Sequence, residues 1–254
     1  MTTAPAPTPT HHRPRRSTLD LATAHRLAET EYQRVLAALR RLAPGDWRKP
    51  TACTGWDVRA LATHLLGMAE MAATMRENLR QNLTARRRGG VFIDALTALQ
   101  VEEHAHLTPE QIVERFAEVA PRAARARART PRLVRRLPMP QPEPFPGDTA
   151  WTFGYLIETI LTRDPWMHRV DIADATDIPL ELTPDHDGVL VADVAAEWAS
   201  RHAQPCTLRL TGPAGGRWTF GHDGAELELD AIDFCRRTSG RAPAAGLFRT
   251  QVPF

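Results

Sequence analysis

Residues 51–65 read TACTGWDVRALATHL, and this stretch decides how the rest of the chain is interpreted. Thr54, followed three residues later by Asp57, fits the pattern in which polar side chains cap the first turn of a helix, so we expect a helix over about 55–82. Its apolar residues recur at helical spacing and would face a core: Leu61, Leu65, Met68 and Ala72. His64 lies on the same inward side, where a histidine is either an ordinary core residue or a ligand for a metal ion.

Further helices are predicted on both sides of this one. Apolar residues recur with helical periodicity over about 18–42, 91–104, 108–130 and 149–176. Thr108 and Pro109 supply a cap and a first-turn proline. Three arginines and two glycines at 86–90 are expected to end the helix that contains His64. Five prolines within 138–147 predict a crossing loop.

The pattern changes after Pro179. One helix is expected over about 185–203, and alternating apolar residues follow at 208–210, 218–220 and 227–229. Asp223-Gly224 between the last two segments is typical of a β-hairpin, and Asp230 is expected to cap a short helix over about 231–239. We therefore expect an α+β protein. It would have a disordered tail over 1–17, a helical bundle over 18–178, and a smaller C-terminal α/β domain with an antiparallel sheet over 179–254.

The composition excludes several classes of protein. The chain has 254 residues and a formal net charge of +2, which does not favour binding to nucleic acid. The arginine-rich stretch 122–136 is interpreted as a solvated helix face, and His104 and His106 as surface residues at a helix end. No apolar run is long enough to span a membrane, and the N-terminus lacks the apolar core of a signal peptide.

Two further features bear on source and compartment. The three cysteines, Cys53, Cys206 and Cys235, are too scattered for a disulfide framework or a metal knuckle, which favours the cytoplasm. Of the 32 basic residues Lys49 is the only lysine, which indicates a G+C-rich genome such as an actinobacterial one.

A possible metal site comes from residues far apart in the sequence. Asp164 and His168 are four residues apart and therefore share one face of a helix, where a carboxylate and an imidazole can chelate one cation. Across a helical bundle, His64 could supply a third ligand. Two histidines and a carboxylate leave coordination positions open, as catalytic metal sites do.

Three segments carry a resemblance to a known family. The stretch 51–65 resembles the region of the first metal histidine in the DinB-like superfamily, and more closely in the mycothiol-dependent maleylpyruvate isomerase family. Residues 166–171, WMHRVD, are similar to that family's second histidine region. Residues 230–236, DAIDFCR, with Gly240 and Arg241 following, resemble its smaller C-terminal domain.

The resemblance implies a DinB-like four-helix bundle that binds a divalent metal, usually zinc, through His, Glu and His. By position these ligands correspond to His64, Asp164 and His168. Asp164 departs from the family's glutamate: its side chain is shorter by one methylene group but can still bind zinc through oxygen.

The implied chemistry uses mycothiol as a cosubstrate: a metal-bound thiolate adds to a small electrophilic substrate. Release of the thiol would make the protein an isomerase, and retention of the new C–S bond a thiol transferase. Asp171 is either a partner that orients a ligand or a solvated residue, and Arg236 and Arg241 are candidate anchors for a substrate carboxylate. A non-enzymatic binding or regulatory protein and a metal-dependent hydrolase stay open as alternatives. The protein would be a monomer or a homodimer with no membrane or nucleic-acid partner.

Overall fold

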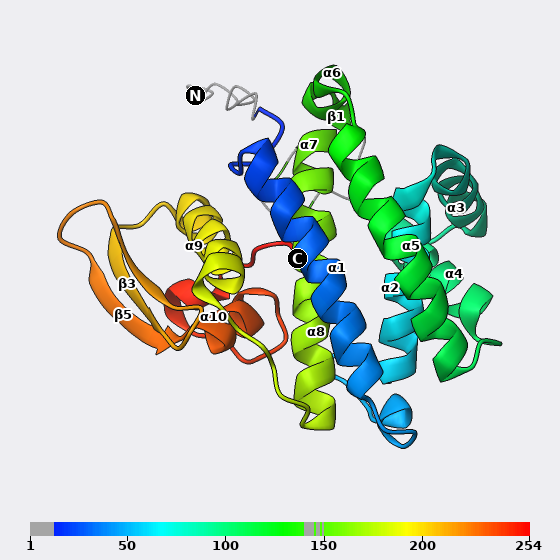
Figure 1. Cartoon of the computed structure of the whole chain (residues 1–254). Coiled ribbons are helices and arrows are strands. Elements are labelled where there is room, and N and C mark those ends of the chain that lie inside the picture. Colours follow the sequence, from blue (N-terminus) through cyan, green and yellow to red (C-terminus); the bar gives the residue numbers. More distant parts are fainter. Residues whose placement is uncertain (1–12, 140–144, 146–147, 149) are drawn as a thin grey trace, which may run out of the picture.

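The computed structural model describes residues 13–139, 145, 148 and 150–254 (Figure 1). Most of the predicted tail and most of the predicted proline-rich loop lie outside these residues. Arg15, within the predicted tail, exchanges backbone hydrogen bonds with Ala150 and Thr152. Its guanidinium pairs with Asp148 at 2.7 Å. The chain is therefore held against the main body of the protein from this point on.

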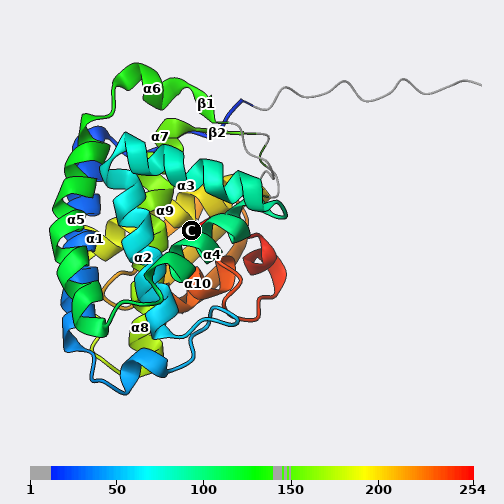
Figure 2. The same ribbon diagram turned by 90° about the vertical axis from the view of Figure 1, so that its right-hand side faces the viewer.

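Four long helices form the bundle and lie side by side in Figures 1 and 2. They are α1 (Leu21–Arg41), α2 (Val58–Ala73), α5 (Pro109–Arg129) and α8 (Leu161–Thr176). Asp20 caps α1, and Thr108 and Gln111 form a full capping box at the start of α5. Buried apolar side chains of these helices, Val35, Leu61, Leu65, Phe116 and Ile172 among them, form their common core.

The helix that carries His64 begins and ends at different residues from those predicted. Asp57, not Thr54, is its N-cap, and its side chain accepts a hydrogen bond from the backbone of Ala60. It ends at Ala73, where Thr74 turns extended and caps a separate helix, α3 (Met75–Arg88). Gly89 then takes a positive φ of 73°, and α4 (Phe92–His104) returns along α3. This α3–α4 pair packs against α2, as Figure 2 shows.

The segment that leads into α8 is more irregular than predicted. A short strand β1 (Pro138–Met139), within the predicted loop, pairs with β2 (Trp151–Thr152). One turn, α7 (Phe153–Tyr155), and a π-helical turn at Leu156–Ile160 precede α8. Short helical turns also occur at Asp46–Arg48, Arg132–Arg136 (α6), Pro184–Gly188 and Gly246–Arg249.

The arginine-rich stretch 122–136 is not a uniformly solvated face, because Arg127 and Arg135 are buried. Arg127 donates to the carbonyl oxygens of Ile157 and Leu161. Arg135 pairs with Glu158 at 2.5 Å. Both arginines thus bind the irregular segment before α8, a long-range role that a helical charge pattern does not reveal.

The C-terminal part contains α9 (Val189–His202), β3 (Cys206–Thr211), β4 (Gly216–Phe220), β5 (Ala225–Asp230) and α10 (Ala231–Thr238), the last capped by Asp230 as predicted. The predicted hairpin between β4 and β5 is wrong. The strand order is β4-β3-β5, with β3 and β5 parallel. The turn after β4 crosses the start of β3, where a Cβ on Gly224 would lie 2.0 Å from the carbonyl oxygen of Pro205. Glycine is needed for this crossing, not for a hairpin turn.

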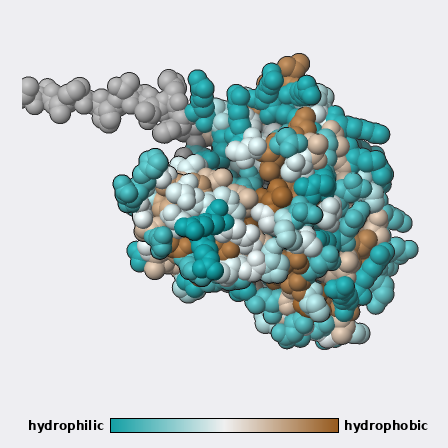
Figure 3. Space-filling model, turned by 60° about the vertical axis from the view of Figure 1, so that its left-hand side comes forward, coloured by the Kyte–Doolittle hydropathy of each residue, from teal (hydrophilic) through white to brown (hydrophobic). Residues whose placement is uncertain are grey.

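The predicted fold class, a helical bundle with a smaller C-terminal α/β part, is confirmed, and its sheet is mixed rather than wholly antiparallel. The two parts share α8, because Trp166 and Met167 pack with Trp198 and Phe234 in a second core. No helix among the described residues is long and apolar enough to cross a membrane. On the face drawn in Figure 3, hydrophilic atoms predominate and hydrophobic ones form small separate patches.

Candidate metal centre

The structure brings together the three predicted metal ligands. His64 comes from α2, and Asp164 and His168 come from successive turns of α8. His64 Nε2 lies 3.5 Å from Asp164 Oδ2, and His168 Nε2 lies 3.4 Å from Asp164 Oδ1. One ligand atom from each residue lies within 4.8 Å of the others. The carboxylate is therefore placed between the two imidazoles, and the shorter aspartate reaches both.

This spacing fits a bound cation better than it fits hydrogen bonds. Ligand atoms about 2.1 Å from a tetrahedral zinc ion are about 3.4 Å apart, whereas a hydrogen bond between these groups would be nearer 2.9 Å. Asp164 Oδ2 is buried and has no hydrogen-bond partner. A buried carboxylate oxygen without a donor is costly unless a cation balances it, so the residues present fit a divalent metal ion.

The electrostatics of the site favour an ionised carboxylate. Burial by itself would raise the pKa of Asp164, but His168 and His64 hold that pKa well below its ordinary value. Burial would likewise lower the pKa of His168, whereas Asp164 and Asp171 raise it well above the usual value. A cation entering the site would therefore compete with a proton on His168.

Each histidine is also held by a partner on its other ring nitrogen. Nδ1 of His64 lies 2.8 Å from Oε1 of Gln100, and Nδ1 of His168 lies 3.1 Å from Oδ2 of Asp171. Hydrogen bonds at Nδ1 leave both Nε2 atoms free to face Asp164. Sequence reasoning proposed Asp171 as such a partner but did not find Gln100.

Asp171 is buried, so its interpretation as a solvated helix residue is wrong. Its two carboxylate oxygens accept hydrogen bonds of 3.0 and 2.9 Å from Nε of Arg241. Burial would raise the pKa of Asp171, but the hydrogen bond with His168 and the charge of Arg241 lower it. Arg241 thus reaches the site through Asp171, and its Nη2 also lies 3.5 Å from Nδ1 of His168 and 3.9 Å from Sγ of Cys53.

Cys53 was set aside as a scattered cysteine, but it lies beside the centre. Its Sγ is 3.6 Å from Oδ2 of Asp171 and 3.8 Å from Nδ1 of His168. These three residues form a second group with ligand-like spacing. Arg241 already neutralises Asp171, however, so a cation is less well accommodated here than beside the unpartnered oxygen of Asp164. The signal for Cys53 was its position within the stretch 51–65.

Two other residues define the limits of the centre. The ring of Trp56 lies 5.2 Å from that of His64 and 6.3 Å from that of His168, centroid to centroid, and forms an aromatic wall. Arg236 does not join the group, because its guanidinium pairs with Asp174 at 2.8 Å.

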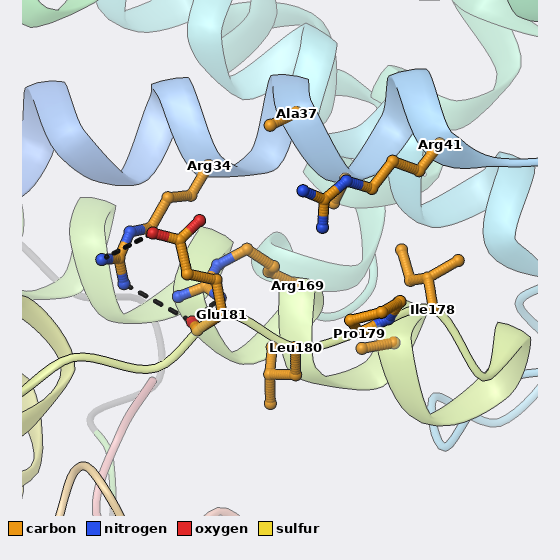
Figure 4. Close-up of a pocket in the computed structure, with 10 residues that line it drawn as sticks. Arg34, Ala37, Arg41, Arg169, Ile178, Pro179, Leu180 and Glu181 are labelled. Carbon is orange, nitrogen blue, oxygen red and sulfur yellow. Dashed lines mark hydrogen bonds and ion pairs between the residues drawn. The ribbon is translucent and has the colours of Figure 1, made fainter.

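A pocket elsewhere on the molecule is separate from this centre. It lies between α1 and the segment 178–181, and no member of the metal centre lines it (Figure 4). Arg34 and Arg169 in its wall are paired with Asp187, and Arg34 also pairs with Glu181. The charges of Arg34 and Arg169 are thus already compensated by carboxylates.

The fold and the converging side chains define a helical-bundle protein with a candidate metal centre and an appended α/β part. The family described as mycothiol maleylpyruvate isomerase N-terminal domain matches residues 28–173, and the chain belongs to this family. No curated protein matches the chain significantly.

Two similar solved structures are of the mycothiol-dependent maleylpyruvate isomerase, one of them a mutant. Their identities to this chain are 16% and, for the mutant, 14%. Each has a TM-score of 0.58, and each comparison covers 88% of this chain and 90% of the other. The likeness therefore extends beyond the bundle to the fold of the C-terminal part.

Proposed function

We propose that the chain is a mycothiol-dependent isomerase in which His64, Asp164 and His168 hold a divalent cation, with zinc as the expected ion. The observation that carries the proposal is the carboxylate of Asp164 between the Nε2 atoms of His64 and His168, with its Oδ2 buried and without a hydrogen-bond partner. The name of the family and of the two similar structures supports mycothiol as the cosubstrate and a small molecule such as maleylpyruvate as the substrate.

A divalent cation at this position would lower the pKa of a coordinated thiol and favour its thiolate form at neutral pH. Addition of the thiol sulfur to one carbon of a carbon–carbon double bond turns that bond into a single bond, about which the substrate rotates. Loss of the same thiol restores the double bond in the other geometry, so the thiol is not consumed.

The residues around the ligands have separate tasks in this proposal. Asp171 and Arg241 orient His168, and Trp56 closes one side of the site against water. Because Arg241 is engaged by Asp171, its main task is positioning rather than the carboxylate anchoring expected from sequence. Arg236 is assigned no part, since Asp174 pairs with it outside the centre.

Metal analysis of the purified protein tests the first half of the proposal. We expect about one equivalent of zinc in the wild-type protein and its loss in His64→Ala and His168→Ala. Retention of wild-type metal content in both variants would show that the ligands are wrongly assigned.

Mycothiol binding, measured by calorimetry with and without zinc, tests the second half. We expect binding only with zinc, followed by isomerisation of maleylpyruvate. Equal binding without the metal contradicts the thiolate chemistry. A product that keeps the C–S bond would identify a transferase, hydrolysis without thiol a hydrolase, and binding without turnover a non-enzymatic protein.

A further inference from the structure

A chain of buried amide side chains leads from the α3–α4 pair to His64. Gln81 of α3 and Gln100 of α4 are both fully buried, at 0% exposure. Nε2 of Gln100 donates to Oε1 of Gln81 at 2.9 Å, and Oε1 of Gln100 lies 2.8 Å from Nδ1 of His64. Packing of the core alone does not require two buried glutamines that are hydrogen-bonded to each other and to a candidate metal ligand.

The direction of this chain is fixed at its far end. Nε2 of Gln81 donates to the backbone oxygen of Gly67 and to Oε1 of Glu77, both at 3.0 Å. A carbonyl oxygen can only accept, so this end of Gln81 must be its NH₂ group and its other end the oxygen. Because Oε1 of Gln81 can only accept, the group of Gln100 that faces it is the NH₂ group, and the oxygen of Gln100 faces His64. Nδ1 of His64 must then carry the hydrogen, and Nε2 keeps its lone pair.

Gly67 makes the close approach possible. A Cβ at this position would lie 2.7 Å from both Cβ and Cγ of Gln100. Only glycine therefore lets α4 bring Gln100 against α2, one turn beyond His64. Gly67 contributes a second time, because its carbonyl oxygen accepts from Gln81.

We propose that Gly67, Gln81 and Gln100 form a positioning relay that fixes the ring orientation and the tautomer of His64, so that Nε2 faces the cation position beside Asp164. This inference rests on the proposed metal site. It assigns the α3–α4 pair a role in metal affinity, although neither helix supplies a ligand. Loss of such a hydrogen-bonded partner typically weakens metal binding 10- to 100-fold.

The experiment measures zinc affinity by competition with a chromophoric chelator, and the tautomer of His64 by ¹⁵N NMR of the imidazole rings at alkaline pH. In Gln100→Leu and in Gly67→Ala we expect 10- to 100-fold weaker zinc binding. In the wild-type protein without metal we expect the Nδ1–H form of His64, and in Gln100→Leu a mixture of both tautomers.

Thr176→Val is the matched control. It removes one buried side-chain hydrogen bond in α8, from Thr176 to the carbonyl oxygen of Ile172, without touching the relay. We expect it to leave zinc affinity unchanged. The relay is refuted if folded Gln100→Leu binds zinc as tightly as the wild-type protein, or if His64 in the wild-type protein has its hydrogen on Nε2.

The two proposals can fail separately. A wild-type protein that binds no zinc would refute the metal site, and the tautomer of His64 would still decide the relay. If Gln100→Leu does not fold, the relay is tested instead by the zinc affinity of Gly67→Ala and by the tautomer of His64 in the wild-type protein.

Discussion

Arg127 donates a hydrogen bond of 2.9 Å to the carbonyl oxygen of Leu161. In a regular helix the N–H of residue 165 would donate to this oxygen, but Pro165 has no N–H. The guanidinium of Arg127 also donates to the carbonyl oxygen of Ile157, within the π-helical turn. One buried arginine thus supplies the donor that Pro165 lacks and also binds the π-helical turn before it. The helix that carries Asp164 and His168 depends on a side chain from α5.

Arg127→Leu should therefore destabilise the protein by about 2–4 kcal/mol, because buried carbonyl oxygens lose a charged donor. The free energy of unfolding from urea denaturation measures the effect. Arg125→Leu, at an exposed position of the same helix, is the control and should change it by less than about 0.5 kcal/mol. Equal effects of the two substitutions would contradict the assigned role of Arg127.

Asp164→Asn should reduce zinc affinity by more than the 10- to 100-fold typical for loss of a supporting partner, because it removes a charged ligand itself. The same chelator competition measures it. Asp174→Asn, an exposed aspartate of the same helix that pairs with Arg236, is the control and should keep wild-type affinity. A small effect at Asp164 would show that the carboxylate is not a ligand.

His104 was expected on the surface, yet it is buried and its Nε2 lies 2.9 Å from Oε2 of Glu70. Burial alone would lower the pKa of His104, but Glu70 and the backbone oxygen of Gln100 outweigh it and raise that pKa. Because the pKa of His104 is higher in the folded than in the unfolded protein, the pair contributes its full stabilisation below about pH 6.5, the pKa of an unfolded histidine. This contribution is lost as the pH rises through the pKa of His104 in the folded protein.

The unfolding free energy should therefore fall between pH 6 and pH 9 more steeply in the wild-type protein than in Glu70→Gln. His106→Gln, at the exposed neighbouring histidine, should follow the wild-type profile. Parallel profiles for the wild-type protein and Glu70→Gln would contradict the coupling of Glu70 to His104.

Gly224→Ala should destabilise the C-terminal part by more than about 2 kcal/mol, because the new Cβ would overlap the carbonyl oxygen of Pro205 where the chain crosses β3. Gly45→Ala is the matched control. Gly45 has a φ of −74° and no atom within 4 Å of an added Cβ, so this substitution should be neutral or slightly stabilising. A tolerated Gly224→Ala would mean that the crossing differs from the one described.

Local signals in the sequence were interpreted correctly where a few neighbouring residues decide the outcome. Thr108 caps its helix and Pro109 follows in the first turn, as predicted. Gly89, however, ends α3 and not the helix that contains His64. The four-residue spacing of Asp164 and His168 places both on one helical face. The convergence of His64 with them was predicted by the bundle topology and by the family resemblance.

The predictions that failed, and the site residues that were missed, depend on contacts between distant segments of the chain. The strand order follows from a crossing over Pro205, which alternation of apolar residues does not encode. Cys53 and Gln100 approach the histidines only after α8 and α4 have packed against the chain around α2. The position of Cys53 within 51–65 was its only signal in the sequence, and Gln100 had none.

The sharing of α8 between two cores has a consequence for any attempt to divide this chain. Trp166 and Met167 lie next to the metal ligands in sequence but pack into the C-terminal core with Trp198. A fragment cut near residue 178 would display both side chains to solvent on the helix that holds Asp164 and His168. Such a fragment should aggregate or lose its ligand geometry, so gene fusions and truncations that respect the apparent domain boundary would still damage the centre.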